Sequence, residues 1–288
     1  MQLQGRRAII TGANRGLGRE IAAQYVRAGA SVLLTARDEK LLKEVQAELA
    51  PLAKGSQRIE ILGGDVAEES HCKEAATRLA KLPGDALILV NNAGVYGPKG
   101  LIEDVDWAEW ADAIRINLFG LVLMTRAVIP LMRKANYGKI VNLSGGGATN
   151  PLPRISAYAA GKAAVVRMNE TLAEELKDAH VDVNAIAPGA LNTRLLDEVL
   201  EAGPEKVGKD FYERSLKQRD KGGAPLEKGA ELAVFLASKE SDGITGRLIS
   251  ALWDRWEEFP KWRDEMAKND VYTLRRIVAK DRGLDWDK

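Results

Sequence analysis

Short apolar segments alternate with longer amphipathic segments along most of the 288 residues. Seven segments have the length and the apolar, β-branched composition of buried strands; they are Ala8–Thr11, Ser31–Thr35, Arg58–Leu62, Ala86–Asn91, Lys139–Leu143, Val181–Ala187 and about Arg247–Ala251. Helical patterns lie between them, most clearly at Glu39–Ala53, Glu69–Lys81, Asn117–Lys134 and Ser156–Ala179. Strands separated by helices of this length predict an α/β fold, a doubly wound parallel sheet of about seven strands with helices on both faces. A ligand should then bind outside the carboxyl ends of the strands.

A glycine-rich turn follows the first expected strand. It reads Gly12-Ala13-Asn14-Arg15-Gly16-Leu17-Gly18 and opens an amphipathic helical pattern. Glycines there permit tight backbone turns and let main-chain N–H groups approach a pyrophosphate at the positive end of the helix. The context of strand before and helix after predicts a dinucleotide site, whereas the alternative is an ordinary strand-to-helix turn.

A tyrosine and a lysine stand four residues apart at Tyr158 and Lys162. Residues at this spacing share a helix face, so the ammonium can approach the phenol. A free phenol has a pKa of about 10, and a nearby fixed cation lowers it. We therefore expect a lowered Tyr158 pKa and a tyrosine that exchanges a proton with an alcohol or carbonyl oxygen. The spacing alone is common on surface helices.

With both features present, the chain resembles the classical short-chain dehydrogenase/reductases from residue 1 to about residue 250. The cofactor motif of that family, T-G-x-x-x-G-x-G, is matched by Thr11, Gly12, Gly16 and Gly18. Further matches follow in the order that the family has; they are Asp65-Val66, Asn91-Asn92-Ala93-Gly94, Asn117, Tyr158 with Lys162, Pro188-Gly189 and Thr193.

The resemblance implies a Rossmann-type fold and an oxidoreductase that interconverts a secondary alcohol and a ketone. It implies that Tyr158 is the general acid/base, that Lys162 lowers its pKa and binds the nicotinamide ribose, and that Asn117 holds a relay water. The cofactor-binding set it implies is Gly12, Asn14, Arg15, Gly16, Leu17, Gly18, Arg37, Asp65, Val66, Asn92, Ala93, Gly94, Tyr158, Lys162, Pro188, Gly189 and Thr193. The alternative is a dinucleotide-binding sensor or scaffold of the same fold whose catalysis is reduced or lost.

The end of the second expected strand bears on the choice of nicotinamide cofactor. An NAD enzyme usually places a carboxylate there to accept the ribose hydroxyls, but this chain has Ala36 followed by Arg37. A guanidinium can hold a 2′-phosphate through two hydrogen bonds, and Arg15 offers a second cation. We therefore expect NADP(H) to be preferred, with NAD(H) as the alternative. Arg37 could instead be a solvated loop charge, and Asp38 should cap the next helix.

One position departs from the pattern of the family, which commonly has a serine thirteen residues before the tyrosine. Here that position is Gly145, and the nearest serine is Ser144. We take Ser144 as the candidate hydroxyl for the substrate oxygen. The alternatives are a backbone N–H of the glycine run, acting like an oxyanion-hole donor, and Thr149. Ser156 is better interpreted as a helix N-cap.

The chain after Thr193 is specific to this protein. We expect one dehydrogenase/reductase domain over residues 1–252, with a substrate lid at about 190–228, followed by an extension over residues 253–288. The extension holds four of the six tryptophans, which are Trp253, Trp256, Trp262 and Trp286. Large apolar rings tend to be covered, so the extension should pack on the body or on a neighbouring subunit. A homo-oligomer, either a dimer or a tetramer, is expected.

Composition bears on the partners and the cellular location of the protein. A formal net charge of +1 gives no general reason to bind nucleic acid or a membrane. The single cysteine, Cys72, cannot form an internal disulfide, which suits a reducing cytoplasm. The first residues lead directly into a strand, leaving no room for a signal peptide, and no apolar run approaches the ~20 residues that span a bilayer. His71 and His180 lie outside the motifs, so no metal site is expected. The expected partner is a small carbonyl or alcohol substrate.

Overall fold

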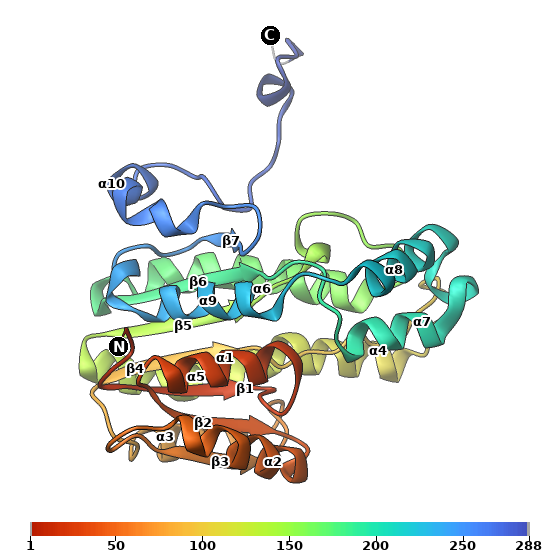
Figure 1. Ribbon diagram of the computed structural model, residues 1–288. Coiled ribbons are helices and arrows are strands. Elements are labelled where there is room, and N and C mark those ends of the chain that lie inside the picture. Colours follow the sequence, from red (N-terminus) through yellow and green to blue (C-terminus); the bar gives the residue numbers. More distant parts are fainter. Residues whose placement is uncertain (1, 287–288) are drawn as a thin grey trace.

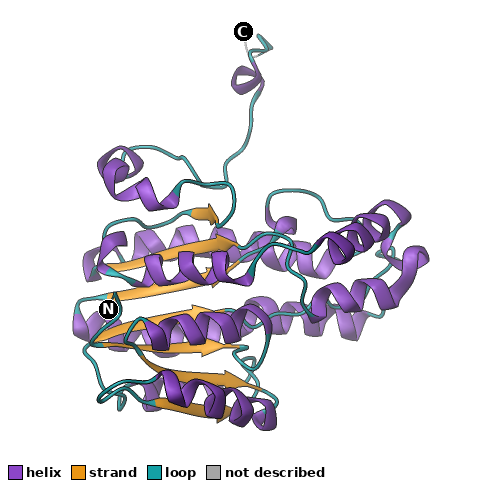
Figure 2. Ribbon diagram, viewed as in Figure 1, coloured by secondary structure: helices purple, strands orange, loops and turns teal. Residues whose placement is uncertain are grey.

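The computed structural model describes residues 2–286, and its centre is a seven-stranded sheet (Figure 1, Figure 2). The strands are β1 (Arg6–Thr11), β2 (Ser31–Ala36), β3 (Ile59–Gly63), β4 (Ala86–Asn91), β5 (Gly138–Leu143), β6 (Val181–Ala187) and β7 (Leu248–Ser250). Their order is β3-β2-β1-β4-β5-β6-β7, and every neighbouring pair is parallel. The predicted doubly wound parallel sheet is confirmed.

Two layers of helices cover the sheet. One layer is α1 (Gly16–Arg27), α2 (Glu39–Leu49) and α9 (Leu226–Ala237), and the other is α3 (Glu69–Leu79), α5 (Gly120–Ala135) and α6 (Ser156–Glu175). Along β1, Ala8 and Ile10 face the first layer while Ile9 faces the second, as the alternation of strand side chains requires. Strands buried on both faces are mostly apolar, which explains the apolar runs Ala8–Ile10 of β1, Val32–Leu34 of β2 and Ala86–Val90 of β4.

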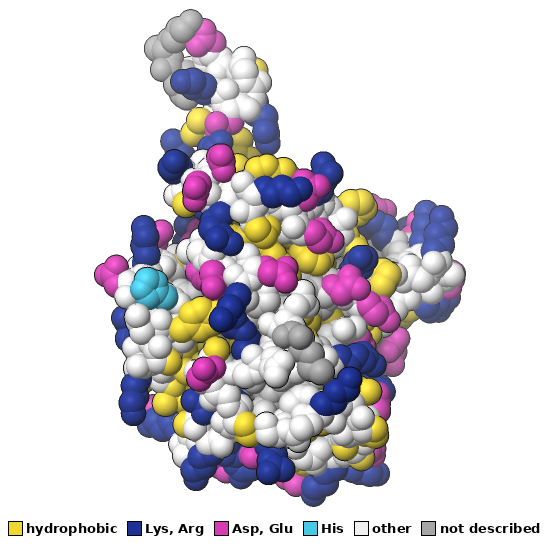
Figure 3. All heavy atoms as spheres, turned by 60° about the vertical axis from the view of Figure 1, so that its left-hand side comes forward, with side chains coloured by type: hydrophobic (Ala, Val, Ile, Leu, Met, Phe, Trp, Pro, Cys, Tyr) yellow, Lys and Arg dark blue, Asp and Glu magenta, His cyan; other side chains and the backbone are white. Residues whose placement is uncertain are grey.

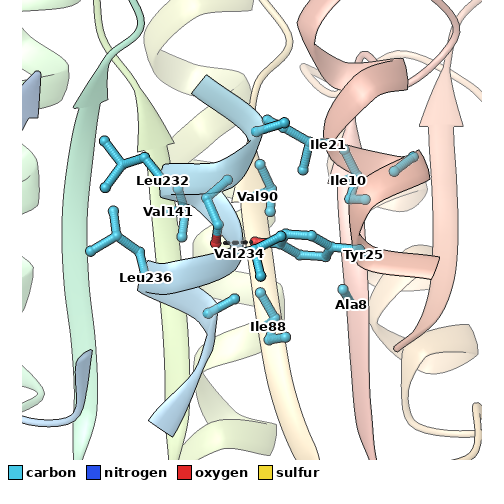
Figure 4. Packing of buried hydrophobic residues seen from close by; sticks show 14 of the residues in the cluster. Ala8, Ile10, Ile21, Tyr25, Ile88, Val90, Val141, Leu232, Val234 and Leu236 are labelled. Carbon is cyan, nitrogen blue, oxygen red and sulfur yellow. Dashed lines mark hydrogen bonds between the residues drawn. The ribbon is translucent and has the colours of Figure 1, made fainter. Parts of the chain in front are cut away.

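Tyr25 links two helices of the first layer, α1 and α9. Its side chain is fully buried between α1 and α9, and its hydroxyl donates to the carbonyl of Ala233 at 2.9 Å (Figure 4). Burial raises the pKa of Tyr25 and keeps the phenol protonated. Because a buried hydroxyl without a partner is costly, this bond fixes α9 against α1.

The strand order reverses between β1 and β4, so their carboxyl ends open a crevice of the kind in which α/β proteins bind ligands. Helices α4 (Trp107–Ile114), α7 (Arg194–Val207) and α8 (Lys209–Lys221) lie beyond the carboxyl ends of the strands, at the right of Figure 1. Gly203 and Gly208 have φ angles of 76° and 86°, a left-handed backbone that breaks the helical path within and after α7. Short 3₁₀ turns lie at Ala50–Leu52, Gly146–Ala148, Lys177–Ala179 and Lys239–Ser241.

Two predicted helix caps have different outcomes. The Asp38 side chain accepts from the N–H of Leu41 at 3.0 Å and caps α2, as predicted. The N-cap of α6 is Ile155, so the interpretation of Ser156 as a cap is wrong. The Ser156 hydroxyl instead accepts from the indole N–H of Trp110 at 3.0 Å, which ties α6 to α4.

Helix α4 continues through a π-helical segment, Arg115–Phe119, into α5. The combined helix Trp107–Ala135 has 29 residues, and an 18-residue window within it has a mean hydropathy of 1.6. The expectation that no apolar segment reaches membrane-spanning length is therefore corrected. Of that window, 39% is buried inside the fold, where Met124 and Val128 belong to the core, so length and composition indicate a membrane span only weakly.

The extension after β7 is partly folded onto the body. It contains a 3₁₀ segment at Trp256–Trp262, α10 (Arg263–Met266) and a 3₁₀ turn at Ala279–Arg282. Trp256 and Phe259 are buried in the core, whereas Trp253 is 83% and Trp286 is 76% exposed. Figure 1 shows the last described residues leading away from the body.

Two backbone regions of the extension are fastened to the edge of the sheet. The N–H of Leu248 in β7 donates to the carbonyl of Tyr272 at 2.8 Å. The buried guanidinium of Arg247 donates to three carbonyls of the extension, those of Met266, Asn269 and Val271.

Candidate active site

The glycine-rich loop between β1 and α1 leaves little room for a side chain at Gly12, Gly16 or Gly18. Gly12 and Gly16 have φ angles of 64° and 52°, which L-residues rarely adopt. A Cβ at Gly18 would lie 2.4 Å from the Gly12 oxygen, and one at Gly16 would lie 3.3 Å from a methyl group of Thr193. The bare backbone at the N-terminus of α1 fits a bound pyrophosphate, and Thr193 lies beside it.

Hydrogen bonds join this loop to the end of β4. The Thr11 hydroxyl accepts from the backbone N–H groups of Asn92 and Ala93, each at 3.0 Å. The Asn92 side chain donates in return to the carbonyls of Thr11 at 2.8 Å and Gly12 at 3.1 Å. The crevice between β1 and β4 is therefore held in one shape before any ligand binds.

Asp65 and Val66 lie after β3, where the resemblance places the adenine ring. Burial alone would raise the pKa of Asp65, but the N–H of Ala67 at 2.9 Å and the guanidinium of Arg115 at 3.0 Å lower it overall. The carboxylate therefore stays charged and acts as an acceptor. Val66 packs against Gly120, where a Cβ would lie 2.7 Å from a Val66 methyl group.

Arg37 follows the last residue of β2 and is exposed, next to the Ala36 that ends the strand. Its charge contributes to lowering the pKa of Asp65, so both residues belong to the same end of the crevice. His71 also lies here, although the sequence analysis placed it outside the site. Its Nε2 is 2.7 Å from the Thr35 hydroxyl, and burial lowers the pKa of His71. No signal in the sequence pairs these residues, which come from β2 and α3.

Tyr158 and Lys162 lie on one turn of α6, both buried. The Lys162 Nζ is 5.6 Å from the centre of the Tyr158 ring and donates to the carbonyl of Leu143 at 2.6 Å. Burial lowers the pKa of Lys162 to about 8. Burial also raises the pKa of Tyr158, and Tyr96 adds to the effect. The expected lowering of the Tyr158 pKa is therefore wrong, because the loss of solvent outweighs an ammonium that is bonded elsewhere.

Asn117 lies in the π-helical segment, a backbone irregularity that is frequent at functional sites. Its side-chain oxygen accepts from the N–H of Val95 at 2.9 Å, and its side-chain nitrogen donates to the Val95 carbonyl at 2.8 Å. A Cβ at Gly94 would lie 3.0 Å from the Asn117 oxygen and 3.6 Å from the Lys162 Nζ. The structure thus brings Asn117, Gly94 and Lys162 together.

Gly145, rather than Ser144, faces the tyrosine hydroxyl. A Cβ at Gly145 would lie 2.2 Å from the Tyr158 oxygen. Gly145 has an extended backbone, and successive side chains of an extended chain point to opposite sides. The Ser144 hydroxyl is buried without a hydrogen-bond partner among the described residues. The structure gives no hydrogen bond between Ser144 and Tyr158.

An apolar group of side chains from the helices beyond the sheet covers Tyr158. Tyr96 meets the Tyr158 ring edge-on, with ring centres 4.7 Å apart and an interplanar angle of 74°. Around them pack residues from α7, α8 and the loop before α6, namely Leu152, Ile155, Val199, Ala202, Val207, Phe211 and Tyr212. The lid region therefore lies directly over the predicted proton donor. Sequence reasoning missed Tyr96, which belongs to no motif.

A doubly wound sheet with a glycine-rich loop after β1 and a Tyr–Lys pair at its carboxyl edge matches the pattern of the short-chain dehydrogenases. The family model described as short chain dehydrogenase matches residues 6–203. The chain belongs to this family, whose members are oxidoreductases that use NAD(H) or NADP(H).

Relatives and solved structures agree with this assignment. Short chain dehydrogenase tazN from Aspergillus terreus is 32% identical over 96% of this chain, which spans 59% of the length of that relative. The 3-oxoacyl-acyl-carrier-protein reductase of Thermotoga maritima is 33% identical, over 86% of this chain and 97% of the relative. The crystal structure of a gluconate 5-dehydrogenase from Burkholderia cenocepacia, in complex with NADP and tartrate, superposes with a TM-score of 0.75 at 27% identity and covers 86% of this chain and 94% of its own.

Proposed function

We propose that the protein is an NADP(H)-dependent oxidoreductase that interconverts a secondary alcohol and a ketone, with Tyr158 as the general acid/base. The observation that carries this proposal is the convergence of Tyr158, Lys162 and Asn117 beside the glycine loop at the carboxyl edge of the sheet. Hydride transfer would be supplied by the bound nicotinamide. The chain itself would position the substrate oxygen at the Tyr158 hydroxyl.

The glycine loop and the strand ends would hold the cofactor. In this proposal, the backbone of Gly12–Gly18 receives the pyrophosphate, Asp65 and Val66 receive the adenine, and Lys162 reaches the nicotinamide ribose. The remaining predicted contacts, Asn92, Ala93, Gly94, Pro188, Gly189 and Thr193, lie at the ends of β4 and β6 or just beyond them. Arg37, with Arg15 as a second cation, would select the 2′-phosphate, because a guanidinium pairs with phosphate through two hydrogen bonds. Binding of NAD(H) is the weaker alternative.

The raised pKa of Tyr158 bears on its part in the proton transfer. A phenol that keeps its proton at neutral pH is ready to donate that proton to a carbonyl oxygen. The buried site therefore holds the phenol in the protonated form that carbonyl reduction requires. Two groups are candidates to polarise the carbonyl. One is the backbone N–H of Gly145, the residue that faces Tyr158, and the other is the Ser144 hydroxyl, which has no partner among the described residues but would have to turn toward Tyr158. Ser144→Ala separates the two, because it removes only the hydroxyl.

The test is a screen of carbonyl compounds with NADPH, followed by nicotinamide absorbance on native protein and on Tyr158→Phe. Loss of general acid catalysis should lower turnover by about 10²–10⁴-fold, while calorimetric NADPH binding stays near the native value. Equal turnover by the two proteins would remove Tyr158 from the mechanism.

A dinucleotide-binding sensor or scaffold is the alternative function, and the glycine at position 145 is the observation that favours it. It predicts tight NADPH binding and no turnover of any compound in the same screen.

We further propose that the protein is a cytoplasmic homo-oligomer with a small-molecule substrate. On the face in Figure 3, basic and acidic side chains are interspersed, which gives no one-sign field to attract nucleic acid there. The apolar helix Trp107–Ala135 leaves Trp107 72% and Phe119 54% exposed, and a neighbouring subunit packed on this helix would cover both rings. Light scattering after gel filtration should show a dimer or a tetramer, and Phe119→Glu should reduce its mass. A native monomer would contradict this proposal.

A further inference from the structure

Lys99 is a nearly buried cation close to the proposed proton donor. It lies in the loop after β4, and its side chain is 13% exposed. Its Nζ is 5.8 Å from the centre of the Tyr96 ring, and that ring is itself 4.7 Å from the Tyr158 ring. The Tyr96 ring is thus a neighbour of both the ammonium and the Tyr158 ring. No motif in the sequence includes Lys99.

The ammonium is incompletely neutralised. Its Nζ donates to the carbonyl of Gly97 at 3.1 Å and approaches one oxygen of Glu198 in α7 at 3.4 Å. An ammonium has three donors, and these two contacts are the ones the described residues give it. The other oxygen of Glu198 is 3.2 Å from the Arg194 guanidinium. One carboxylate thus serves two cations, and the group of three carries a net positive charge.

We propose that Lys99 binds a carboxylate of the substrate, so that the site takes keto acids and the corresponding hydroxy acids. Glu198 already places a carboxylate oxygen 3.4 Å from the ammonium, at the position that a substrate carboxylate would take. When the substrate binds, its carboxylate replaces Glu198 at the Lys99 Nζ, while Glu198 keeps Arg194. The proposal rests on the proposed oxidoreductase function, and it assigns the class of substrate.

The apolar side chains over Tyr158 fit the rest of such a substrate. Val199 and Val207 of α7 and Phe211 of α8 pack in the same cluster as Tyr96 and Tyr158. A hydrocarbon segment that joins the carboxylate to the reacting carbonyl would lie against these side chains. The burial of Lys99 strengthens its attraction for an anion, because charge interactions grow as water is excluded.

The test compares levulinate, and the two oxo acids with one and two further methylene groups, with their methyl esters. NADPH consumption gives kcat/KM, and calorimetry gives binding to the protein loaded with NADP⁺. Native protein should prefer the best acid to its ester. Lys99→Gln should lower kcat/KM for the acid by about 10- to 100-fold, chiefly through KM, and leave the ester unchanged. Lys99→Arg should retain part of the preference.

Glu198→Gln is the matched control, because it breaks the same ion pair from the other side. If Lys99 receives the substrate, Glu198→Gln frees the ammonium and raises kcat/KM for the acid. If the Lys99–Glu198 ion pair only holds α7 in place, both substitutions should impair turnover of the acid and of the ester alike. That result would overturn the proposal. Absence of acid binding, or an acid preference that survives Lys99→Gln, would overturn it as well. Acid binding that depends on Lys99, without turnover of any compound, would instead support the anion site and refute the proposed oxidoreductase reaction.

Discussion

Replacement of Gly145 by alanine should disable catalysis while the fold persists. The new Cβ would lie 2.2 Å from the Tyr158 hydroxyl oxygen and 3.1 Å from the ring carbon that carries it. Real Cβ contacts under 3.0 Å are essentially never seen, so the hydroxyl must retreat. A displacement of about 1 Å in a reacting group can cost roughly 10²-fold in rate. We therefore expect kcat/KM to fall by about 10²-fold or more, with a loss of about 1–3 kcal/mol in unfolding free energy from overpacking.

The assay pairs steady-state NADPH consumption with calorimetric NADPH binding and urea unfolding. Gly146→Ala is the control, because a Cβ there meets nothing within 4 Å, and activity should stay native. Native kcat/KM in Gly145→Ala, with NADPH binding and stability also unchanged, would show that the Tyr158 hydroxyl does not work from this position.

Two further predictions concern the cofactor and the buried lysine. Arg37→Asp should weaken NADPH binding by roughly 10- to 100-fold and NADH binding little. Lys40→Asp, an equal change of charge at an exposed position of α2, is the control. Equal losses for both cofactors in Arg37→Asp would refute the role of Arg37 in selecting NADPH. Burial lowers the Lys162 pKa from 10.5 to about 8, so between these values the unfolded chain holds a proton that the folded chain has released. The unfolding free energy should therefore rise with pH across that window, relative to Lys162→Met. Denaturant titrations of both proteins from neutral pH to about pH 10 measure this, and parallel pH profiles would contradict the buried, shifted ammonium.

The parts of the fold that the sequence predicts are those whose causes are local. The strands can be predicted because burial on both faces favours short apolar runs within them. The Asp38 cap can be predicted because its hydrogen-bond partner, Leu41, is three residues away in the sequence. The hydroxyl of Ser156 looks equally suited to a cap, but its partner is Trp110 on another helix, a contact that only the packing of α4 on α6 creates.

The same distinction holds in the candidate site. The glycine loop and the Tyr158–Lys162 pair follow from spacing within one element. The Tyr158 pKa does not, because its direction depends on how completely α7 and α8 exclude water from the ring. Tyr96 and Lys99 were missed for a related reason. Their relation to Tyr158 arises where the loop after β4 meets the lid helices.

The way the extension is fastened limits how copies of this chain could assemble. β7 is an edge strand, and an uncovered edge is a template for pairing with another chain. The Tyr272 carbonyl occupies the N–H of Leu248 on that edge. A second copy therefore cannot add its own strand there without first displacing the extension. A protein truncated after residue 252 would consequently expose the edge of β7 to pairing with other chains. It would also leave the buried Arg247 guanidinium without the three carbonyls that accept its hydrogen bonds.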